Sequence, residues 1–379
     1  MFDQISQFIQ EKFNTNDFIP LHEPRFIGLE KELLNQTVDS TFVSSVGEFV
    51  DQFEENISSF TQSSHAIAVM NGTAALHLSM LLAGVKPGDF VITQALTFVA
   101  TCNAISYCNA EPIFIDVDKK TLGLCPVALD SWLDENATFD KNGSCILKQT
   151  KRSIRACIPM HTFGHPAEID SIVNICKKWK ISVIEDAAES LGSLYKNIHT
   201  GTFGLMGTLS FNGNKIITTG GGGAILCNEE IYNQGKHLST TAKVPSETYF
   251  FHDQIGFNYR LPNLNAALGC AQFESLNFFI EKKRDLAMEY HQLFKDSDFH
   301  FFTEPENCRS NYWLNTILCQ DRTHRDEFLT NMNDMKIMTR PIWTPMNKLP
   351  MFSNSINDGL ENTAWIEDRV VNIPSSVII

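Results

Sequence analysis

A single lysine, Lys215, stands in a polar turn between two β-like runs of the chain. The turn covers Ser210–Thr219 and is followed by four glycines, Gly220–Gly223. A lysine amine held in such a place can attack a carbonyl group, and pyridoxal phosphate is the main cofactor that uses a lysine in this way. Most loop lysines are only solvated charges, so Lys215 becomes a candidate through the residues that accompany it.

A strand-like run about thirty residues upstream ends in two carboxylates. The run Ile181–Ile184 is rich in β-branched residues, as in a buried parallel strand, and Glu185 and Asp186 follow it. Ligands of open α/β sheets bind at the carboxyl ends of the strands. A pyridoxal ring needs a carboxylate facing its nitrogen, because the protonated ring accepts electrons. Asp186 is the candidate, and Glu185 is expected to be structural because alternate strand residues face opposite ways.

Another strand-like run ends at a glycine turn earlier in the chain. Residues Ala66–Met70 are followed by Asn71, Gly72 and Thr73 and then by the helix-forming segment Ala74–Gly84. The start of such a helix offers free backbone N–H groups and a favourable dipole to a phosphate group. Many strand–helix units share this pattern, so it indicates a phosphate site only in combination with the lysine and the aspartate.

Phe98 is a candidate for stacking on a flat heterocycle. It lies in the segment Thr93–Thr101, which follows the strand-like run Asp89–Ile92 and leads into another helix. Aromatic rings favour offset stacking on other flat rings. The chain has 28 phenylalanines, so a core position explains Phe98 better when it is taken alone. The order of the elements favours the stacking role.

Four motifs in this order resemble the DegT/DnrJ/StrS family of nucleotide-sugar aminotransferases. They are NGTAAL from Asn71, LTFVAT from Leu96, EDAAES from Glu185 and SFNGNKIITTGGGG from Ser210. The likeness extends from about Ile19 to Pro374, nearly the whole chain. The segments Ile19–Phe26 and Pro159–Pro166 are most similar to LegC-type enzymes, which aminate a 4-keto-6-deoxy-2-acetamido sugar nucleotide on the route to legionaminic acid.

The resemblance implies a role for each matching residue. It makes Lys215 the lysine that forms a Schiff base with pyridoxal phosphate and Asp186 the partner of the pyridine nitrogen, as the residues themselves indicate. It makes Phe98 the stacking residue. The phosphate-binding groups that it implies are the backbones of Gly72, Thr73 and Ala74 and the hydroxyl of Ser210.

The resemblance also implies a second subunit. It sends Asn258, in the segment Gly256–Arg260, into the neighbouring subunit's site to contact the phosphate. That arrangement requires a homodimer with shared active sites.

Two positions depart from the common family pattern. Glu189 stands where Gln or His is usual, and Gly221 stands where Glu is usual. The Gly221 change concerns a turn. An ionised carboxylate beside the cofactor's phenolate oxygen would be repelled, so we predict that Glu189 binds the cofactor in its protonated form and donates a hydrogen bond.

Composition bounds the function classes. The chain has 379 residues, 43% hydrophobic and 20% charged, with a net charge of -14. That charge argues against nucleic acid as a partner, and neither a polybasic run nor a membrane-length apolar run is present. The N-terminus has no signal-peptide pattern, and the ten scattered cysteines indicate reduced thiols. We therefore expect a cytoplasmic protein without a metal site.

Alternating strand-like and helix-like stretches predict the α/β class. The strand-like runs lie near residues 66–70, 89–93, 112–117, 154–160, 181–185, 207–211 and 224–227. This order predicts a large, mostly parallel seven-stranded sheet with helices on both faces, and the resemblance implies fold type I of the pyridoxal-phosphate aminotransferases. The gap that holds Lys215 admits no crossover helix, so the last two runs are expected to pair antiparallel.

Two domains are expected. Residues 1–262 form the large cofactor-binding domain with helices near 28–40 and 47–60, and residues 263–379 form a bridging helix and a small C-terminal α/β domain. The bridging helix is the proline-free stretch Asn263–Phe294. Strands near 313–318 and 337–342 and a helix near 325–332 complete the small domain.

Further polar and aromatic residues are candidates for substrate contacts. His161 follows a strand-like run and could donate to the sugar, although a backbone-satisfied loop histidine is equally expected. Arg340 and Trp343 combine a bidentate fork with an aromatic face, which suits a nucleotide or a carboxylate. Lys243 competes for the Schiff-base role but lacks flanking strands and glycines, and it is expected to be solvated or to contact a substrate phosphate.

The sequence thus predicts an aminotransferase that moves nitrogen from L-glutamate to C4 of a sugar nucleotide. Pyridoxamine phosphate is the expected intermediate form of the cofactor. A family dehydratase is an alternative, but by family analogy those enzymes carry histidine in place of Lys215. A bacillosamine-type 4-aminotransferase and a non-catalytic cofactor binder are further alternatives. Motifs decide neither the UDP or GDP carrier nor the stereochemistry of the new amine.

Overall fold

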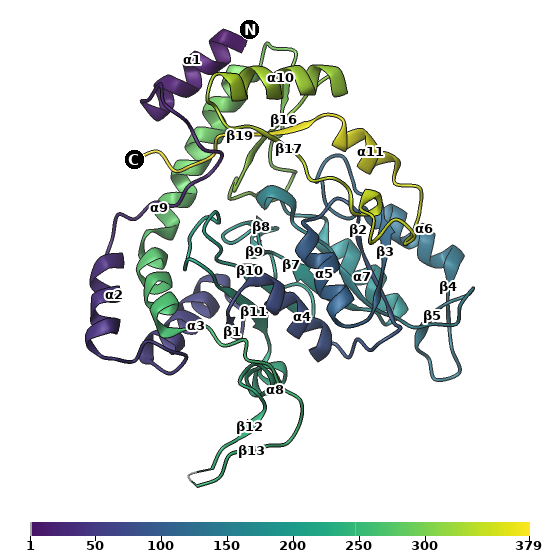
Figure 1. The fold of residues 1–379 in the computed structure, drawn as a ribbon. Coiled ribbons are helices and arrows are strands. Elements are labelled where there is room, and N and C mark those ends of the chain that lie inside the picture. Colours follow the sequence, from purple (N-terminus) through teal and green to yellow (C-terminus); the bar gives the residue numbers. More distant parts are fainter. Residues whose placement is uncertain (1, 247) are drawn as a thin grey trace.

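A computed structural model describes residues 2–246 and 248–379, and its centre is an eight-stranded sheet (Figure 1). In spatial order the strands are β1 (His65–Val69), β11 (Gly223–Cys227), β10 (Met206–Ser210), β7 (Ser182–Asp186), β6 (Ile154–Ile158), β2 (Phe90–Gln94), β3 (Glu111–Ile115) and β18 (Ile356–Asn357). From β10 to β18 all neighbours pair in parallel, so their carboxyl ends lie along one edge.

One strand of this sheet runs against its neighbours. β11 pairs antiparallel with both β1 and β10, as the short gap around Lys215 predicts. The seven predicted strands are present, but the prediction of a seven-stranded sheet was one strand short. The eighth, β18, has only two residues and comes from the C-terminal part of the chain, so no periodic pattern marks it.

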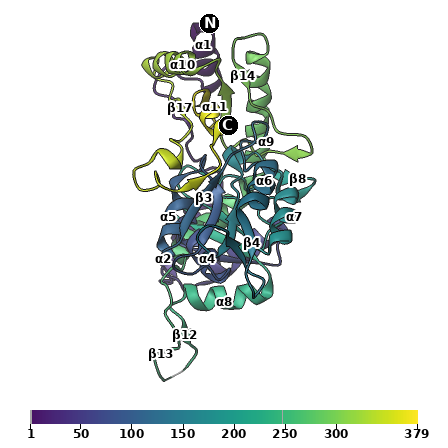
Figure 2. The same cartoon turned by 90° about the vertical axis from the view of Figure 1, so that its right-hand side faces the viewer.

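Helices cover both faces of the sheet because neighbouring strand residues face opposite ways. In β1, Ala66 and Ala68 pack under one layer, whereas Ile67 and Val69 pack under the other. The first layer contains α3 (Glu48–Thr61), α6 (Pro126–Asn136), α7 (Ile169–Trp179) and the first half of α9 (Asn263–Phe294). The second contains α4 (Gly72–Leu82), α5 (Val99–Tyr107) and α8 (Glu229–Ser239). Figure 2 shows α5 on one side of the sheet and α6 and α7 on the other.

The helix α9 joins the large lobe to a smaller one, as its unbroken sequence predicts. Residues up to Ile280 pack in the core of the large lobe, and residues from Leu286 pack in a separate core. The small lobe contains an antiparallel sheet of β14 (His300–Phe301), β16 (Asn315–Leu318), β19 (Val370–Ile373) and β17 (Arg340–Pro341), with α10 (Arg322–Asp334) and α11 (Glu361–Glu367).

The N-terminal helix α1 (Phe2–Phe13) packs with the small lobe, at the top of Figure 1. Its Ile5 and Ile9 share a core with Phe328 of α10. The domain boundary between residues 262 and 263 remains a prediction. That boundary assigns α1 to the large domain, whereas α1 packs against the small lobe. The helix α2 (Glu30–Asp39) packs along α9.

Short elements complete the described chain. They are β4 (Ala137–Phe139), β5 (Cys145–Leu147), β8 (Leu194–Tyr195), β9 (Ile198–His199), β12 (Lys243–Val244), β13 (Phe251–His252), β15 (Cys308–Arg309) and 3-10 turns at Thr162–Gly164 and Met346–Lys348. The β12–β13 hairpin projects from the body in Figures 1 and 2, and Phe250 in its loop is 86% exposed.

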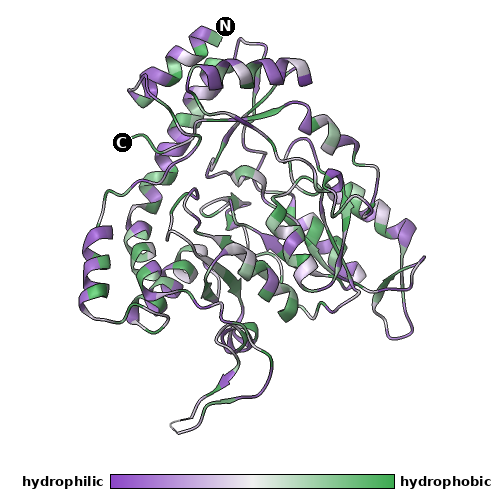
Figure 3. Cartoon of the chain, viewed as in Figure 1, coloured by the Kyte–Doolittle hydropathy of each residue, from purple (hydrophilic) through white to green (hydrophobic). Residues whose placement is uncertain are grey.

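Hydrophobic and hydrophilic residues alternate along the outer helices (Figure 3), as expected for helices that bury one face. Within residues 2–246 and 248–379, no helix combines the length and the apolar character needed to cross a membrane.

Candidate active site

A cavity of about 330 Å³ lies at the carboxyl edge of the parallel strands. It brings together residues that are far apart in the sequence. Its lining is Asn71, Gly72, Thr73, Leu76, Phe98, Ala100, Met160, Asp186, Ala188, Glu189, Ser210, Asn212, Asn214, Lys215, Trp313 and Trp343. Most of the predicted site residues are therefore in one place, and the two tryptophans add a contribution from the chain beyond α9.

The N-terminus of α4 forms one end of the cavity. Asn71 caps this helix, since its Oδ1 accepts the Ala74 N–H at 2.8 Å and its carbonyl oxygen accepts the Ala75 N–H at 3.1 Å. Gly72 approaches Ser210 so closely that a Cβ on Gly72 would lie 3.0 Å from the Ser210 Cβ. The backbone of Gly72 and the hydroxyl of Ser210 therefore share a small space beside a helix N-terminus, which suits a phosphate group.

One predicted phosphate donor, the Ala74 N–H, already has a hydrogen-bond partner within the protein. The Ala74 N–H is bound to the Asn71 cap, and Ala74 does not line the cavity. The expectation for Ala74 is thus wrong in this structure, because the capping side chain takes the donor that a phosphate would need. Gly72 and Thr73, two residues and one residue closer to the cap than Ala74, lie on the cavity wall.

Asp186 ends β7 with its carboxylate in the cavity and only 2% of its surface exposed. Its Oδ2 accepts the Thr101 hydroxyl at 2.7 Å, and its Oδ1 accepts the Ala188 N–H at 3.2 Å. Burial raises the pKa of Asp186, while the Thr101 and Ala188 hydrogen bonds and the Lys215 charge oppose that rise. A cation facing this carboxylate would complete its pairing.

Lys215 extends from the turn after β10 toward Glu189 and Trp313. Its Nζ lies 3.4 Å from Glu189 Oε1 and 4.0 Å from the centre of the Trp313 ring. Trp313 in turn donates its indole N–H to the Asn214 carbonyl oxygen at 2.7 Å, which holds the ring against the lysine turn. The amine is thus shielded on one side by an aromatic face and is only slightly exposed.

Glu189 is buried and its charge is not fixed. Burial raises the pKa of Glu189 to about 7, and the Lys215 charge and the Phe163 hydrogen bond limit the rise. Its Oε2 accepts the Phe163 N–H at 2.9 Å. A carboxyl with this pKa gains and loses its proton near neutral pH, which is compatible with the protonated form that we predict for it beside a phenolate.

Aromatic rings from both parts of the chain face the cavity. Phe98 stands at the start of α5, half-exposed, with its ring centre 6.3 Å from that of Trp343. The exposure contradicts a core role for Phe98 and leaves the ring free to stack on a bound heterocycle. Trp343, predicted as a substrate contact, also lines the cavity.

Two other predicted substrate contacts lie elsewhere. His161 is fully buried and is bonded to Glu185 and to the Ala167 backbone, so the prediction that it lines the site is wrong. Arg340 is exposed on β17 and is absent from the cavity lining. Glu185 has the structural role expected of it.

Asn258 does not line the cavity of its own chain. Its Oδ1 accepts two hydrogen bonds from the Arg260 guanidinium, at 3.1 and 2.9 Å, and its backbone pairs with Thr240. Its role in a neighbouring subunit remains a prediction.

Sequence reasoning missed Thr101, Asn71 and Trp313. The Asn71 cap had a signal, because Asn directly before a helix is a preferred N-cap. Thr101 lies three residues after Phe98 in a segment that had already been singled out, but nothing in the sequence pairs it with Asp186. Trp313 had no local signal, since its contact with Lys215 spans about a hundred residues.

These residues fit pyridoxal phosphate. The narrow space between Gly72 and Ser210 at a helix N-terminus accommodates a phosphate, and buried Asp186 gains a partner if a protonated ring nitrogen faces it. Lys215 supplies an amine on the same cavity wall. Across residues 2–246 and 248–379 no group of three or more His, Cys, Asp or Glu side chains is placed to hold a metal ion.

Comparisons with known proteins agree with this fit. The model of the DegT/DnrJ/EryC1/StrS aminotransferase family matches residues 26–378. The GDP-perosamine synthase of Escherichia coli O157:H7 is 36% identical over 94% of this chain and 93% of its own. The GDP-perosamine synthase of Vibrio cholerae is 33% identical over 94% of each chain.

The fold also matches solved structures. The protein Spr1654 of Streptococcus pneumoniae, solved in its PLP form, matches with a TM-score of 0.82 at 21% identity, over 94% of this chain and 93% of that one. The likeness to this protein concerns the fold. On the family match and the identity to the two synthases, this chain belongs to the DegT/DnrJ/EryC1/StrS aminotransferase family and is a pyridoxal-phosphate-dependent aminotransferase of nucleotide sugars.

Proposed function

We propose that this enzyme transfers the amino group of L-glutamate to C4 of a 4-keto-6-deoxy-2-acetamido sugar nucleotide, for legionaminic acid or a related amino sugar. The observation that carries the proposal is the meeting of Lys215, Asp186 and the Gly72 turn in one cavity. The names of the two perosamine synthases support a nucleotide-sugar substrate and make the GDP carrier the first to test, beside UDP.

The residues divide the work of the reaction between them. When bound, pyridoxal phosphate supplies the carbonyl that receives nitrogen and the ring that accepts electrons. Lys215 would move a proton at Nζ, because it is the amine on the cavity wall and could take the donor's Cα proton and deliver it to the carbon of the cofactor's carbonyl group. Asp186 keeps a positive charge at the ring nitrogen, and the start of α4 binds the phosphate. Trp313 covers Nζ and excludes water from it.

A spectroscopic half-reaction tests this function. Adding L-glutamate without any sugar to the purified holoenzyme is expected to convert the absorbance of the PLP form into that of the PMP form, with release of 2-oxoglutarate. A spectrum that does not change would indicate a non-catalytic binder. Conversion of a sugar without coupled 2-oxoglutarate release would indicate a dehydratase. Paired UDP- and GDP-linked 4-keto substrates then identify the carrier and separate the legionaminic from the bacillosamine type of product.

Replacing Glu189 with glutamine tests its protonation in the holoenzyme. A protonated carboxyl and an amide both donate a hydrogen bond, so we expect Glu189→Gln to keep its cofactor and to change activity by less than about tenfold. Equilibrium dialysis of the cofactor and steady-state kinetics measure both effects. Loss of the cofactor from the variant would show that the carboxylate acts in its ionised form.

The enzyme is proposed to be a homodimer whose sites are shared. The exposed apolar tip of the β12–β13 hairpin and the position of Asn258 outside its own cavity support this proposal. An aspartate at position 258 would repel a phosphate, so we expect Asn258→Asp and Lys215→Ala each to be inactive alone.

Co-expression of these two variants tests the shared site. Random pairing gives about half heterodimers with one intact site each, so about a quarter of the wild-type activity should return. Activity that stays at the level of the separate variants would place Asn258 outside the partner's site.

A further inference from the structure

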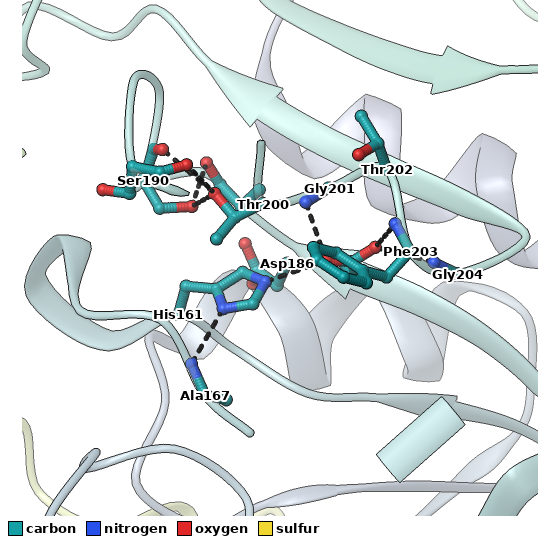
Figure 4. Close-up of polar contacts among 12 residues, drawn as sticks. His161, Ala167, Asp186, Ser190, Thr200, Gly201, Thr202, Phe203 and Gly204 are labelled. Atoms are coloured by element: carbon teal, nitrogen blue, oxygen red, sulfur yellow. Dashed lines mark hydrogen bonds and ion pairs between the residues drawn. The ribbon is translucent and has the colours of Figure 1, made fainter. Parts of the chain in front are cut away.

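His161 closes a turn behind the active site. Its ring Nδ1 accepts the Ala167 N–H at 3.1 Å, so the ring proton is on Nε2, which donates to Glu185 Oε2 at 3.0 Å. The ring thus ties the two ends of the turn 161–167 together and ties that turn to β7. Figure 4 shows His161 between Ala167 and the Gly201–Gly204 segment.

Hydrogen bonds from several groups hold the Glu185 carboxylate in one position, and His161 binds to it there. Besides His161, its carboxylate accepts the N–H groups of Gly201, Phe203 and Gly204, at 2.7, 2.6 and 2.7 Å. All four of these groups donate hydrogen bonds to Glu185, so its buried carboxylate acts only as an acceptor. The four hydrogen bonds together fix the orientation of the carboxylate. Because Glu185 precedes Asp186 on β7 and faces the other way, it lies outside the cavity and cannot take part in the chemistry directly.

The turn that His161 closes contains a strained residue. Phe163 is buried and has φ of +57°, a backbone conformation that bulky L residues rarely adopt. Such a conformation persists only where the surroundings enforce it, and here it points the Phe163 N–H at Glu189 Oε2, 2.9 Å away. Glu189 Oε1 in turn lies 3.4 Å from Lys215 Nζ.

We propose that His161 and Glu185 are positioning residues that hold the Phe163 N–H against Glu189 and thereby set the proton occupancy of Glu189 beside Lys215. The contacts form a continuous series from Glu185 through His161 and the strained turn to Glu189. Its link to catalysis rests on the proposed function of Lys215. In this proposal the role of the buried His161 is to position the turn, which is neither a contact with substrate nor packing alone.

The test is a titration of Glu189 in the cofactor-free enzyme by NMR, with glutamate labelled at the side-chain carboxyl carbon. The Glu189→Gln variant assigns the signal. In the wild type the midpoint is expected near 7, the value that burial gives its pKa. The charged groups that face Glu189 are Lys215 and Asp186, and both stay in place in every variant compared.

Two substitutions of His161 break the series at different points. His161→Phe keeps a ring but removes both hydrogen bonds, and His161→Asn can keep the Ala167 contact but cannot reach Glu185. If the Phe163 N–H is released, the ionised form of Glu189 loses a donor, so we expect both variants to move the midpoint upward, by roughly one pH unit for His161→Phe. In the holoenzyme we expect kcat to change by less than about tenfold, as for Glu189→Gln, because an upward shift favours the neutral form that we predict for Glu189 beside the cofactor.

His199 offers a matched control. It is also a buried histidine, on β9, but its ring accepts the Gly192 N–H and bonds to the Thr200 carbonyl rather than to Ala167 or Glu185. His199→Phe should lower stability while leaving the Glu189 midpoint in place. The proposal is overturned if folded His161→Asn titrates as the wild type does, or if His199→Phe shifts the midpoint equally. Because the titration uses no substrate, its failure is separate from a failure of the proposed reaction.

Discussion

Replacing Lys215 with alanine is expected to lower aminotransferase activity by at least about 10⁴-fold, because the amine that binds the cofactor and moves the proton is lost in one change. Steady-state assays with L-glutamate as donor and a 4-keto sugar nucleotide as acceptor measure the loss. The variant should still fold, since the Lys215 side chain fills space at the cavity wall and forms no part of the buried core.

Lys243 provides the control for this change. It is an exposed lysine on the β12–β13 hairpin, outside the cavity of its own chain. Lys243→Ala should keep the cofactor covalently attached, whatever its effect on substrate binding. Activity of Lys215→Ala within tenfold of the wild type would mean that another group does the proton transfer, and the assignment of Lys215 would be wrong.

Replacing Asp186 with asparagine is expected to lower kcat by about 10² to 10³-fold while cofactor remains bound. The amide has the same shape and can still accept the Thr101 hydroxyl, but it carries no charge to hold the ring nitrogen protonated. The effect is large because the site is fully buried, where a charge interacts strongly. Single-turnover conversion of the PLP form with L-glutamate measures the chemical step directly.

An aspartate away from the cavity shows whether charge alone matters. Asp170 pairs with Lys196 and Tyr195, outside the cavity that holds Lys215. Asp170→Asn should change kcat by less than about twofold, since partly exposed ion pairs contribute little. A similar small effect for Asp186→Asn would contradict the role of Asp186 as the partner of the ring nitrogen.

Much of the fold was predictable because the strands of a buried parallel sheet carry a strong local signal. Runs such as Ile181–Ile184 are mostly apolar and β-branched, and Asn263–Phe294 has the length and composition of a long helix. The strand β18 was not predictable, because two residues form no pattern and their pairing with β3 is set by the tertiary fold. The packing of α1 against α10 is a long-range contact of the same kind.

The residues of the active site likewise include some that were predictable from the sequence and some that were not. The placement of Lys215, Asp186 and Gly72 in one cavity was predictable, because each lies at or just after the carboxyl end of a strand, where ligands bind. Thr101 and Trp313 were not predictable, because each takes part in the site through a contact with a residue that is remote in the sequence. His161 was misassigned because a histidine after a strand looks the same in sequence whether it faces a ligand or a buried carboxylate.

The most direct test of the account is to reduce the cofactor-saturated enzyme with borohydride and map the labelled peptide by mass spectrometry. Reduction makes a carbon–nitrogen link permanent, so the account predicts one modified residue, Lys215, in the peptide that contains the turn after β10. A label on any other lysine, such as Lys243, or no label from cofactor-saturated protein would contradict it.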